Sequence, residues 1–223
     1  MKRGDSMENK YKMTLEQNIF LAKRNLVDNV YANARMEGIN VTFPQTKTIL
    51  DGVNVTSLKL DEIQCILNLR DAWKFVINNI EKQFNLDFIC KVNEYVARNE
   101  SLEWGTLRTG MVEITGTQYI PEIPNKEKVE KNIKDILKIE NATQRAITYM
   151  LYGMISQLFW DGNKRTSTIV ANKIMIENGA GIIKVPDEKL EKFNELLTEY
   201  YNSNDMQKIS DFIYENCIDG III

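Results

Sequence analysis

The chain of 223 residues contains no histidine. An imidazole is the usual proton carrier near neutral pH and a common metal ligand. Its absence therefore excludes mechanisms that need a histidine as general base, zinc ligand or pH switch. Hydrophobic residues make up 43% of the chain and charged residues 26%, as in an ordinary folded domain. We expect a folded protein whose chemistry comes from other side chains.

Cysteine is also scarce. Cys65, Cys90 and Cys217 are odd in number and far apart, and each lies in an apolar helical pattern. This usage predicts buried thiols in a reducing compartment. No apolar run approaches the roughly 18 residues that a membrane span needs, and the N-terminus lacks the apolar core of a secretion signal. We therefore expect a soluble, cytoplasmic protein that does not bind membranes.

Several binding signatures are missing as well. The net charge of -3 argues against a broad nucleic-acid surface, although it says nothing about a small phosphate pocket. The chain has no Walker A spacing, no glycine fingerprint for dinucleotides, no serine nucleophile elbow and no Cys/His metal cluster. We expect no nucleic-acid partner.

The four prolines leave two long stretches in which apolar residues recur at helical spacing. No repeat or linker divides the chain, so we expect one domain over residues 1–223 with an all-α fold. It would include a helix pair over 142–178 and C-terminal helices over 187–218. The periodicity predicts helices near residues 60–80, 86–96, 129–137, 146–158, 169–178, 190–200 and 206–213.

One segment departs from the helical pattern. Val112 and Ile114 alternate with polar residues before a Thr115–Gly116 turn, and residues 117–119 read as a returning strand. The pattern predicts a short β-hairpin over residues 111–120. An exposed hairpin beside a cleft could pair with an extended peptide, and a structural turn packed on helices is an equally good interpretation.

The most informative stretch is SQLFWDGNKRTST, residues 156–168. It joins two helical patterns through Gly162, and the backbone amides of residues 163–166 would be the unpaired donors of a new helix, which attract anions. Lys164 and Arg165 add positive charge, and Asp161 could hold a divalent cation against the same phosphates. The pattern suggests a phosphate-and-metal site, but a plain helix–helix turn with a solvated charged start fits it too.

These residues resemble the active-site loop of the Fic (Fido) family. Its signature is His, any residue, Phe, any residue, Asp or Glu, Gly, Asn, Gly or Lys, and Arg. Residues 105–124 are similar to the family's target-docking flap, and residues 33–50 to its inhibitory segment and the loop after it. The loop residues that match are Phe159, Asp161, Gly162, Asn163, Lys164 and Arg165.

The resemblance implies a compact helical fold that binds a nucleoside triphosphate, with ATP as the candidate substrate. Members transfer AMP to a hydroxyl of a target protein, and the Doc branch, with Lys after the Asn, transfers phosphate. Asp161 would bind Mg, Asn163 and Arg165 would hold phosphates, and Phe159 would anchor the loop. A target segment would dock by strand addition on the flap, formed by Met111, Val112, Glu113, Ile114, Thr115, Gly116, Thr117 and Gln118.

Three departures from the family pattern concern the chemistry. Gln157 occupies the position of the catalytic histidine, and a glutamine can orient a hydroxyl but cannot accept its proton. Lys164 replaces the glycine of AMP-transferring members and leans toward the phosphotransferase branch. Thr168 replaces a second arginine, so a phosphate contact is absent. Two hypotheses follow: a slow transferase, or a silent module that binds nucleotide or target.

The inhibitory segment, about residues 1–50, would contain Asn33, Glu37 and Gly38 at the family's regulatory positions. In the family the glutamate pairs with the second arginine. Because Thr168 stands there, we expect Glu37 to lack that ion pair. A simple helix end explains Glu37–Gly38 equally well.

Other residues have two interpretations. Trp160 could stack on a base or pack beside the helix junction, and Arg108 could hold the flap or be solvated. The tyrosines at 149, 152, 200 and 201 are expected to be structural. The sequence does not identify the target protein, the preferred nucleotide, the oligomeric state or an antitoxin partner.

Overall fold

The structure is a computed structural model that describes residues 7–221. Helices dominate it, as predicted from the periodicity, and none in this range is long and apolar enough to cross a membrane. The ten helices of the described residues are α1 (Leu15–Arg24), α2 (Leu26–Met36), α3 (Phe43–Leu50), α4 (Leu60–Asn78), α5 (Leu86–Val96), α6 (Lys126–Leu137), α7 (Ala142–Ser156), α8 (Asn163–Glu177), α9 (Leu190–Ser203) and α10 (Gln207–Asn216).

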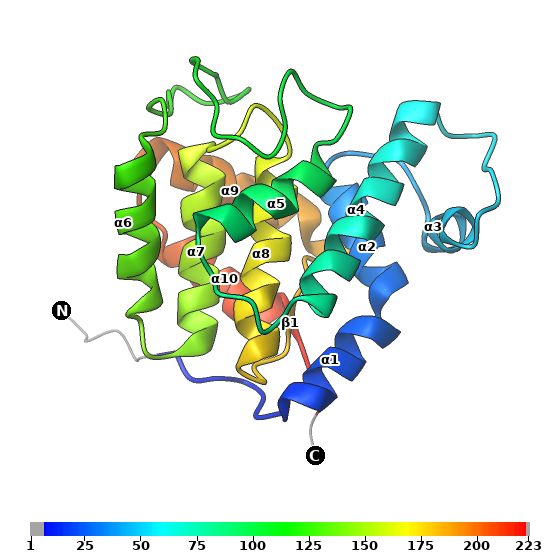
Figure 1. Ribbon diagram of the computed structural model, residues 1–223, viewed down its shortest axis with the longest axis horizontal. Helices are drawn as coiled ribbons and strands as arrows, with labels where there is room; N and C mark the ends of the chain where they lie inside the picture. Colours follow the sequence, from blue (N-terminus) through cyan, green and yellow to red (C-terminus); the bar gives the residue numbers. More distant parts are fainter. Residues whose placement is uncertain (1–6, 222–223) are drawn as a thin grey trace.

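Helix α8 lies at the centre of the molecule (Figure 1) and contacts α1, α2, α4, α5 and α7. Most of its polar side chains are buried, because neighbouring helices surround it. Each needs an internal partner. Asn172 bonds both the N–H and the carbonyl of Ile183, and the Lys173 ammonium donates to the Ile80 carbonyl at 2.6 Å. These bonds fix α8 within the core.

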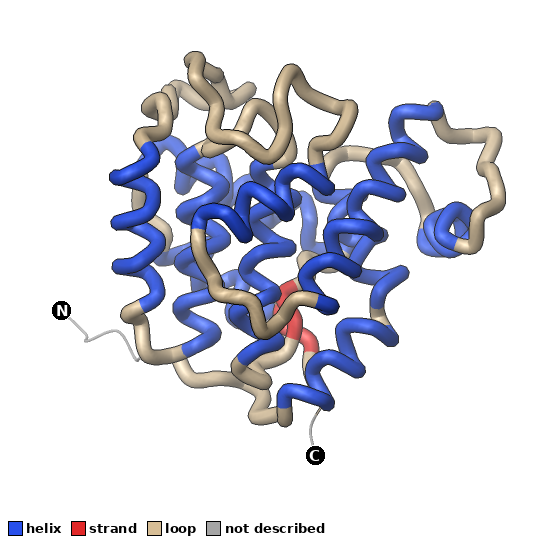
Figure 2. The backbone as a smooth tube through the Cα atoms, in the orientation of Figure 1, coloured by secondary structure: helices blue, strands red, loops and turns tan. Residues whose placement is uncertain are grey.

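A two-stranded antiparallel sheet lies near the C-terminus (red in Figure 2). It pairs β1 (Ile182–Ile183) with β2 (Ile218–Asp219), with Ile182 opposite Asp219. A strand of two residues has no measurable alternation, so the sequence pattern did not predict it.

The predicted β-hairpin over residues 111–120 is wrong. The turn forms, with the Thr117 N–H donating to the Ile114 carbonyl at 3.1 Å, but no strand flanks it. The Gln118 N–H bonds the Asn202 side chain instead of a partner strand. The segment is therefore a loop with one turn at residues 114–117, and not a pair of strands.

The segment after α2 also differs from expectation. Residues 43–50 form α3 rather than continuing as a loop, because Thr42 and Gln45 make reciprocal capping bonds and Pro44 fits the first turn. The part of the expected inhibitory segment before residue 7 lies outside the described residues.

Two long loops gather at one end of the molecule (Figures 1 and 2). One spans residues 97–125, and the other, residues 157–162, joins α7 to α8. Hydrogen bonds join them, since the Arg108 N–H donates to the Leu158 carbonyl at 3.0 Å. This end of the bundle carries the motif residues.

Helices α7 and α8 approach each other closely at Gly153. A Cβ there would lie 2.3 Å from Ser167 Oγ. We predict that Gly153→Ala lowers the free energy of unfolding by about 1–3 kcal/mol through overpacking, although alanine favours helix.

Chemical denaturation of the single variants and of Gly153→Ala combined with Ser167→Ala measures this effect. Removing Oγ should recover part of the loss in a double-mutant cycle. Strictly additive losses would contradict the crowding explanation.

Candidate functional site

The motif turn begins and ends on residues with left-handed backbone. Gln157 caps α7 at φ 45°, and Gly162 precedes α8 at φ 72°. A Cβ on Gly162 would lie 2.8 Å from Val96 Cγ1, so glycine is required both for conformation and for space. These two reversals bring residues 157–163 into a compact loop, as the sequence predicted for Gly162.

Asn163 connects the inside of this loop. Its Oδ1 accepts from the Phe159 N–H at 2.9 Å, and its Nδ2 donates to the Phe159 carbonyl and to Gln157 Oε1. Gln157 Nε2 donates to the Met154 carbonyl at 2.7 Å, and Phe159 is buried. The side-chain amides of Gln157 and Asn163 therefore stabilise the loop, and both are already hydrogen-bonded within the protein.

A residue that the sequence did not single out supports the loop from below. Asn93 on α5 is fully buried and donates to the Asp161 carbonyl at 3.0 Å and to Thr166 Oγ1. Its Oδ1 accepts from the Gly105 N–H. One side chain thus joins α5, the motif turn and the start of the flap. No local pattern marks such an asparagine.

Arg165 is buried among three carboxylates that come from separate segments. Its Nη1 lies 2.6 Å from Glu100 Oε2, its Nε 3.0 Å from Glu37 Oε2, and its Nη2 3.2 Å from Asp161 Oδ1. The Nε contact is an ion pair without hydrogen-bond alignment.

Burial alone would lower the pKa of Arg165, but the charges of Glu37 and Glu100 outweigh it and raise that pKa. The guanidinium also donates to Cys65 Sγ at 2.9 Å. Burial raises the pKa of this thiol to about 12, so it stays neutral at physiological pH. Asn68 binds the other oxygen of Glu100 and fixes that carboxylate.

The end of α2 touches two motif side chains. Gly38 ends α2 at φ 86°, as the helix-end interpretation predicted, and its N–H bonds the Arg35 carbonyl. The Lys164 ammonium donates to the Met36 carbonyl at 3.1 Å, at the negative end of the helix dipole. Glu37 has no ion pair with position 168 and pairs instead with Arg165.

The remaining regulatory and motif positions are buried. Asn33 Oδ1 accepts from Trp73 Nε1 at 2.8 Å, between α2 and α4. Thr168 Oγ1 donates to the Lys164 carbonyl within α8. Neither side chain reaches the surface of the turn.

A cavity of about 370 Å³ lies against the motif turn, so neighbouring side chains do not fill it. Within residues 7–221, the backbone N–H groups of Asn163, Lys164 and Arg165 have no hydrogen-bond partner, as at any helix start. Helix α9, absent from the sequence prediction of the site, contributes one wall. The cavity is lined by Glu37, Glu113, Ile114, Thr115, Gln157, Trp160, Asp161, Gly162, Asn163, Lys164, Asn194, Leu197, Thr198 and Tyr201.

The flap therefore contributes its middle, residues 113–115, to this cavity, whereas Met111 is exposed. Tyr201, expected to be structural, is buried and lines the same cavity. Trp160 packs its ring edge against Gly110, where a Cβ would lie 2.5 Å from Cη2. The packing interpretation of Trp160 thus fits the structure.

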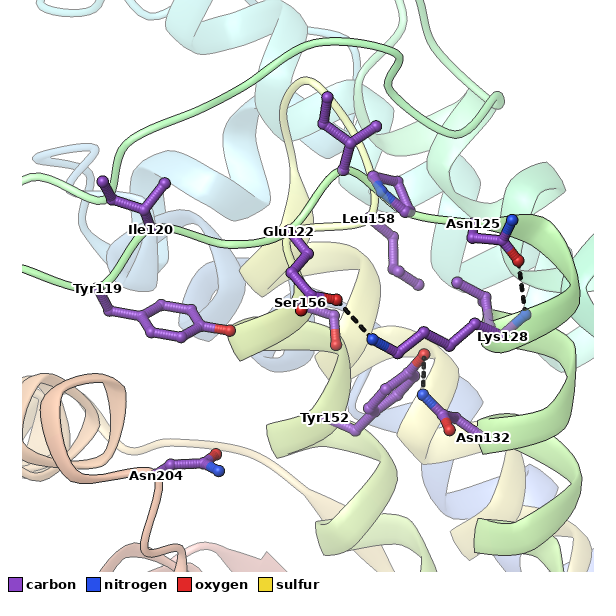
Figure 3. A pocket seen from close by; sticks show the side chains of 13 residues that line it. Tyr119, Ile120, Glu122, Asn125, Lys128, Asn132, Tyr152, Ser156, Leu158 and Asn204 are labelled. Atoms are coloured by element: carbon purple, nitrogen blue, oxygen red, sulfur yellow. Dashed lines mark hydrogen bonds and ion pairs between the residues drawn. The ribbon is translucent and has the colours of Figure 1, made fainter.

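A second cavity, of about 450 Å³, lies on the other side of the flap's end (Figure 3). Tyr119 and Glu122 from the flap face Tyr152 and Ser156 on α7, and Lys128 on α6 pairs with Glu122. Ser156 and Leu158 line this cavity, while Gln157 between them lines the first. The end of α7 separates the two.

No family model matches the sequence. The protein adenylyltransferase fic-1 of Caenorhabditis elegans is 25% identical over 197 residues, which cover 82% of this chain and 36% of that protein. The solved structure of residues 134–508 of that protein superimposes with a TM-score of 0.77 at 21% identity, over 88% of this chain and 62% of that one.

A Fic-domain signalling protein from Bacteroides thetaiotaomicron has a similar structure, with a TM-score of 0.70 at 15% identity, covering 91% of this chain and 87% of that one. The chain is similar in sequence to the adenylyltransferase fic-1 and has the fold of the Fic-domain structures. It spans about a third of the length of its curated relative. A more distant match is IbpAFic2, solved covalently tethered to Cdc42, with a TM-score of 0.52 at 13% identity over 91% of this chain and 68% of that one.

The carboxylate cluster around Arg165 makes a stability prediction. Arg165→Met leaves Glu37, Glu100 and Asp161 without their cation, and we expect a loss of about 3–5 kcal/mol in the free energy of unfolding.

The matched control is Arg98→Met, which removes a partly exposed arginine whose ion pair is with Asp71. It should lose at most about 1 kcal/mol. Urea denaturation compares the two, and equal losses would contradict a special role for the buried cluster.

Proposed function

We propose that the cavity at the start of α8 binds a nucleoside triphosphate, with ATP as the candidate, and that the chain would transfer AMP, or phosphate, to a hydroxyl of a target protein. The observation that carries the proposal is the turn from Asp161 to Arg165: it holds the three unpaired backbone amides that start α8, and its residues Asp161 to Lys164 line a cavity. The adenylyltransferase relative supports the same chemistry.

The residues present fit a phosphate group in part. A cavity of about 370 Å³ lies within the range of roughly 300–1,000 Å³ typical of small-molecule sites. The helix start supplies donors and a positive dipole end. Lys164 and Arg165 are already bonded to Met36 and Glu37 at the end of α2. Full charge neutralisation of a phosphate would therefore require α2 to release them.

Asp161 is the candidate ligand for Mg. Its Oδ1 bonds the Gly162 N–H and Arg165, and Oδ2 has no partner within residues 7–221. No three acidic or thiol side chains of the described residues are arranged to hold a metal ion. A cation here would share Asp161 with oxygens of the phosphates and water, a coordination that suits Mg²⁺. Bound there, Mg²⁺ would offset phosphate charge.

Gln157 determines how fast any transfer would be. Its amide already bonds Met154 and Asn163, so it orients the loop and offers no lone pair basic enough to take a hydroxyl proton. Phosphoryl and nucleotidyl transfer rely largely on positioning and charge, so a slow reaction fits the site.

The flap is the proposed docking place for a target segment. Its residues 111–120 are extended and pair with no strand, so backbone groups remain for strand addition. The tethered IbpAFic2–Cdc42 pair supports a protein as the partner.

The alternative is a silent module that binds nucleotide or a target without transfer. Three features favour it. A glutamine occupies the base position, Thr168 is buried, and the guanidinium of Arg165 is already paired with carboxylates of the protein. Such a module would act by occupancy alone.

Position 157 separates the two functions. If the site is arranged for transfer, Gln157→His should raise transfer from labelled ATP by a factor of ~100 to ~10,000, because it supplies a positioned base.

Gln157→Ala is the control: it supplies no base and loses the amide bonds to Met154 and Asn163, so its transfer should not rise above the wild-type level. Circular dichroism confirms that each variant folds. A folded histidine variant with unchanged transfer, alongside measurable Mg·ATP binding by calorimetry, would favour the silent module. Absence of binding to ATP, GTP and CTP at millimolar concentration would overturn the proposal.

The contact between α2 and Arg165 yields a second prediction. Glu37→Ala frees one side of the guanidinium, and we expect Mg·ATP to bind roughly 5- to 150-fold more tightly by calorimetry.

Glu113→Ala is the matched control, because Glu113 lines the same cavity without an ion pair within residues 7–221. It removes the same charge from the cavity but leaves the ion pair between Glu37 and Arg165 intact. Equal gains in both variants would mean that only the cavity's charge matters.

A further inference from the structure

Arg108 is a buried charge without a carboxylate partner among the described residues. Only 1% of the residue is exposed, and its guanidinium donates exclusively to backbone carbonyls. Buried arginines usually neutralise an acidic side chain. Burial lowers the pKa of Arg108. Such a costly placement calls for an explanation in the segment that Arg108 bonds.

That segment is residues 109–122, which we call the strap. Nη1 donates to the Gly110 carbonyl at 2.5 Å, at the first end of the strap. Nη2 donates to Glu122 at 2.6 Å and to Pro121 at 3.3 Å, at the other end. The guanidinium has a rigid planar fork, so one side chain sets the separation of the two ends.

The same fork attaches the strap to the motif. Nε donates to the Gln157 carbonyl at 2.5 Å, and the Arg108 backbone N–H donates to Leu158. The guanidinium therefore makes four hydrogen bonds, one to the motif loop and three to the ends of the strap. Gly110 packs against the ring edge of Trp160, where a Cβ has no room, which fixes the first end further.

Between its ends the strap makes few hydrogen bonds, although Ile114 and Tyr119 pack against the core. The Thr117 to Ile114 turn bond is internal, and the Gln118 bond to Asn202 is the contact with α9. Residues 113–115 line the motif cavity, while Tyr119 and Glu122 line the second cavity (Figure 3). The position of the strap thus shapes both cavities.

We propose that Arg108 is a positioning residue that fixes both ends of the strap to the backbone of Gln157 and so sets the shape of the motif cavity. The proposal deepens the nucleotide-binding function above and rests on it for its effect on a ligand. Without the fork, the two ends separate from the loop together and residues 113–115 leave the cavity wall.

Hydrogen exchange measured by mass spectrometry tests this directly in the full chain. Arg108→Met removes every donor of the guanidinium while keeping most of the side-chain volume. We expect amide exchange to rise by roughly tenfold or more at the N–H groups of Arg108, Thr117 and Gln118, because their bonds to Leu158, Ile114 and Asn202 break when the strap leaves the loop.

The matched control is Arg145→Met. Arg145 also donates to a backbone carbonyl, that of Ile139 at 2.8 Å, but far from the strap. It should leave strap exchange unchanged. Arg108→Lys keeps the charge without the planar fork and should give an intermediate rise. If Arg108→Met fails to fold, the lysine variant decides by the same criterion.

Affinity for Mg·ATP supplies a readout that a merely structural role would leave unchanged. A strap that leaves its place in most molecules should weaken binding roughly tenfold in Arg108→Met, and not in Arg145→Met. Unchanged strap exchange, or an equal rise over the whole chain, would overturn the positioning role. So would unchanged affinity despite faster strap exchange. If the wild-type chain binds no nucleotide, the proposed function fails, while the exchange data still decide whether Arg108 fixes the strap.

Discussion

The guanidinium of Arg165 is the interaction on which this end of the molecule depends. It is almost fully buried and meets carboxylates from the end of α2, from the loop after α5 and from its own motif turn. A buried charge is tolerated only with close partners, so these three segments must come together for the chain to fold as it does. The same contact that completes the fold therefore occupies a cation of the motif.

Acidic side chains consequently outnumber free cations around the motif cavity. Glu37, Glu113 and Asp161 line it, and Lys164 bonds the end of α2. An anionic ligand would meet a favourable field only from the helix start, unless a divalent cation or a movement of α2 changes the balance. The end of α2 thus binds the two cations of the motif, and the strap forms part of the cavity wall.

Long periodic stretches made the helical fold predictable from the sequence. Gly162 was also predictable, because a single glycine between two helical patterns marks a sharp turn. The hairpin prediction failed because alternation at Val112 and Ile114 describes an extended chain but does not identify its hydrogen-bond partner. In the structure, the side chains of Arg108 and Asn202 bind the backbone of this region at Gly110 and Gln118.

Long-range partners could not be predicted from local pattern. The sequence shows that Glu37 has no arginine partner at position 168. It does not show the pair with Arg165, because only the packing of α2 on α8 brings these two residues together. Asn93 and the α9 wall lie far from the motif in sequence, and a buried asparagine on an amphipathic helix resembles any other polar residue. The resemblance to the Fic family guided the site because it carries such distant information.

The central claim is that the amides at the start of α8 bind a triphosphate. Titration of ¹⁵N-labelled protein with Mg·ATP, followed by two-dimensional NMR, tests it most directly. The account predicts that the amide signals of Asn163, Lys164 and Arg165 shift first and saturate together. It would be contradicted if these three signals stay in place at millimolar Mg·ATP, or if only residues outside the motif cavity respond.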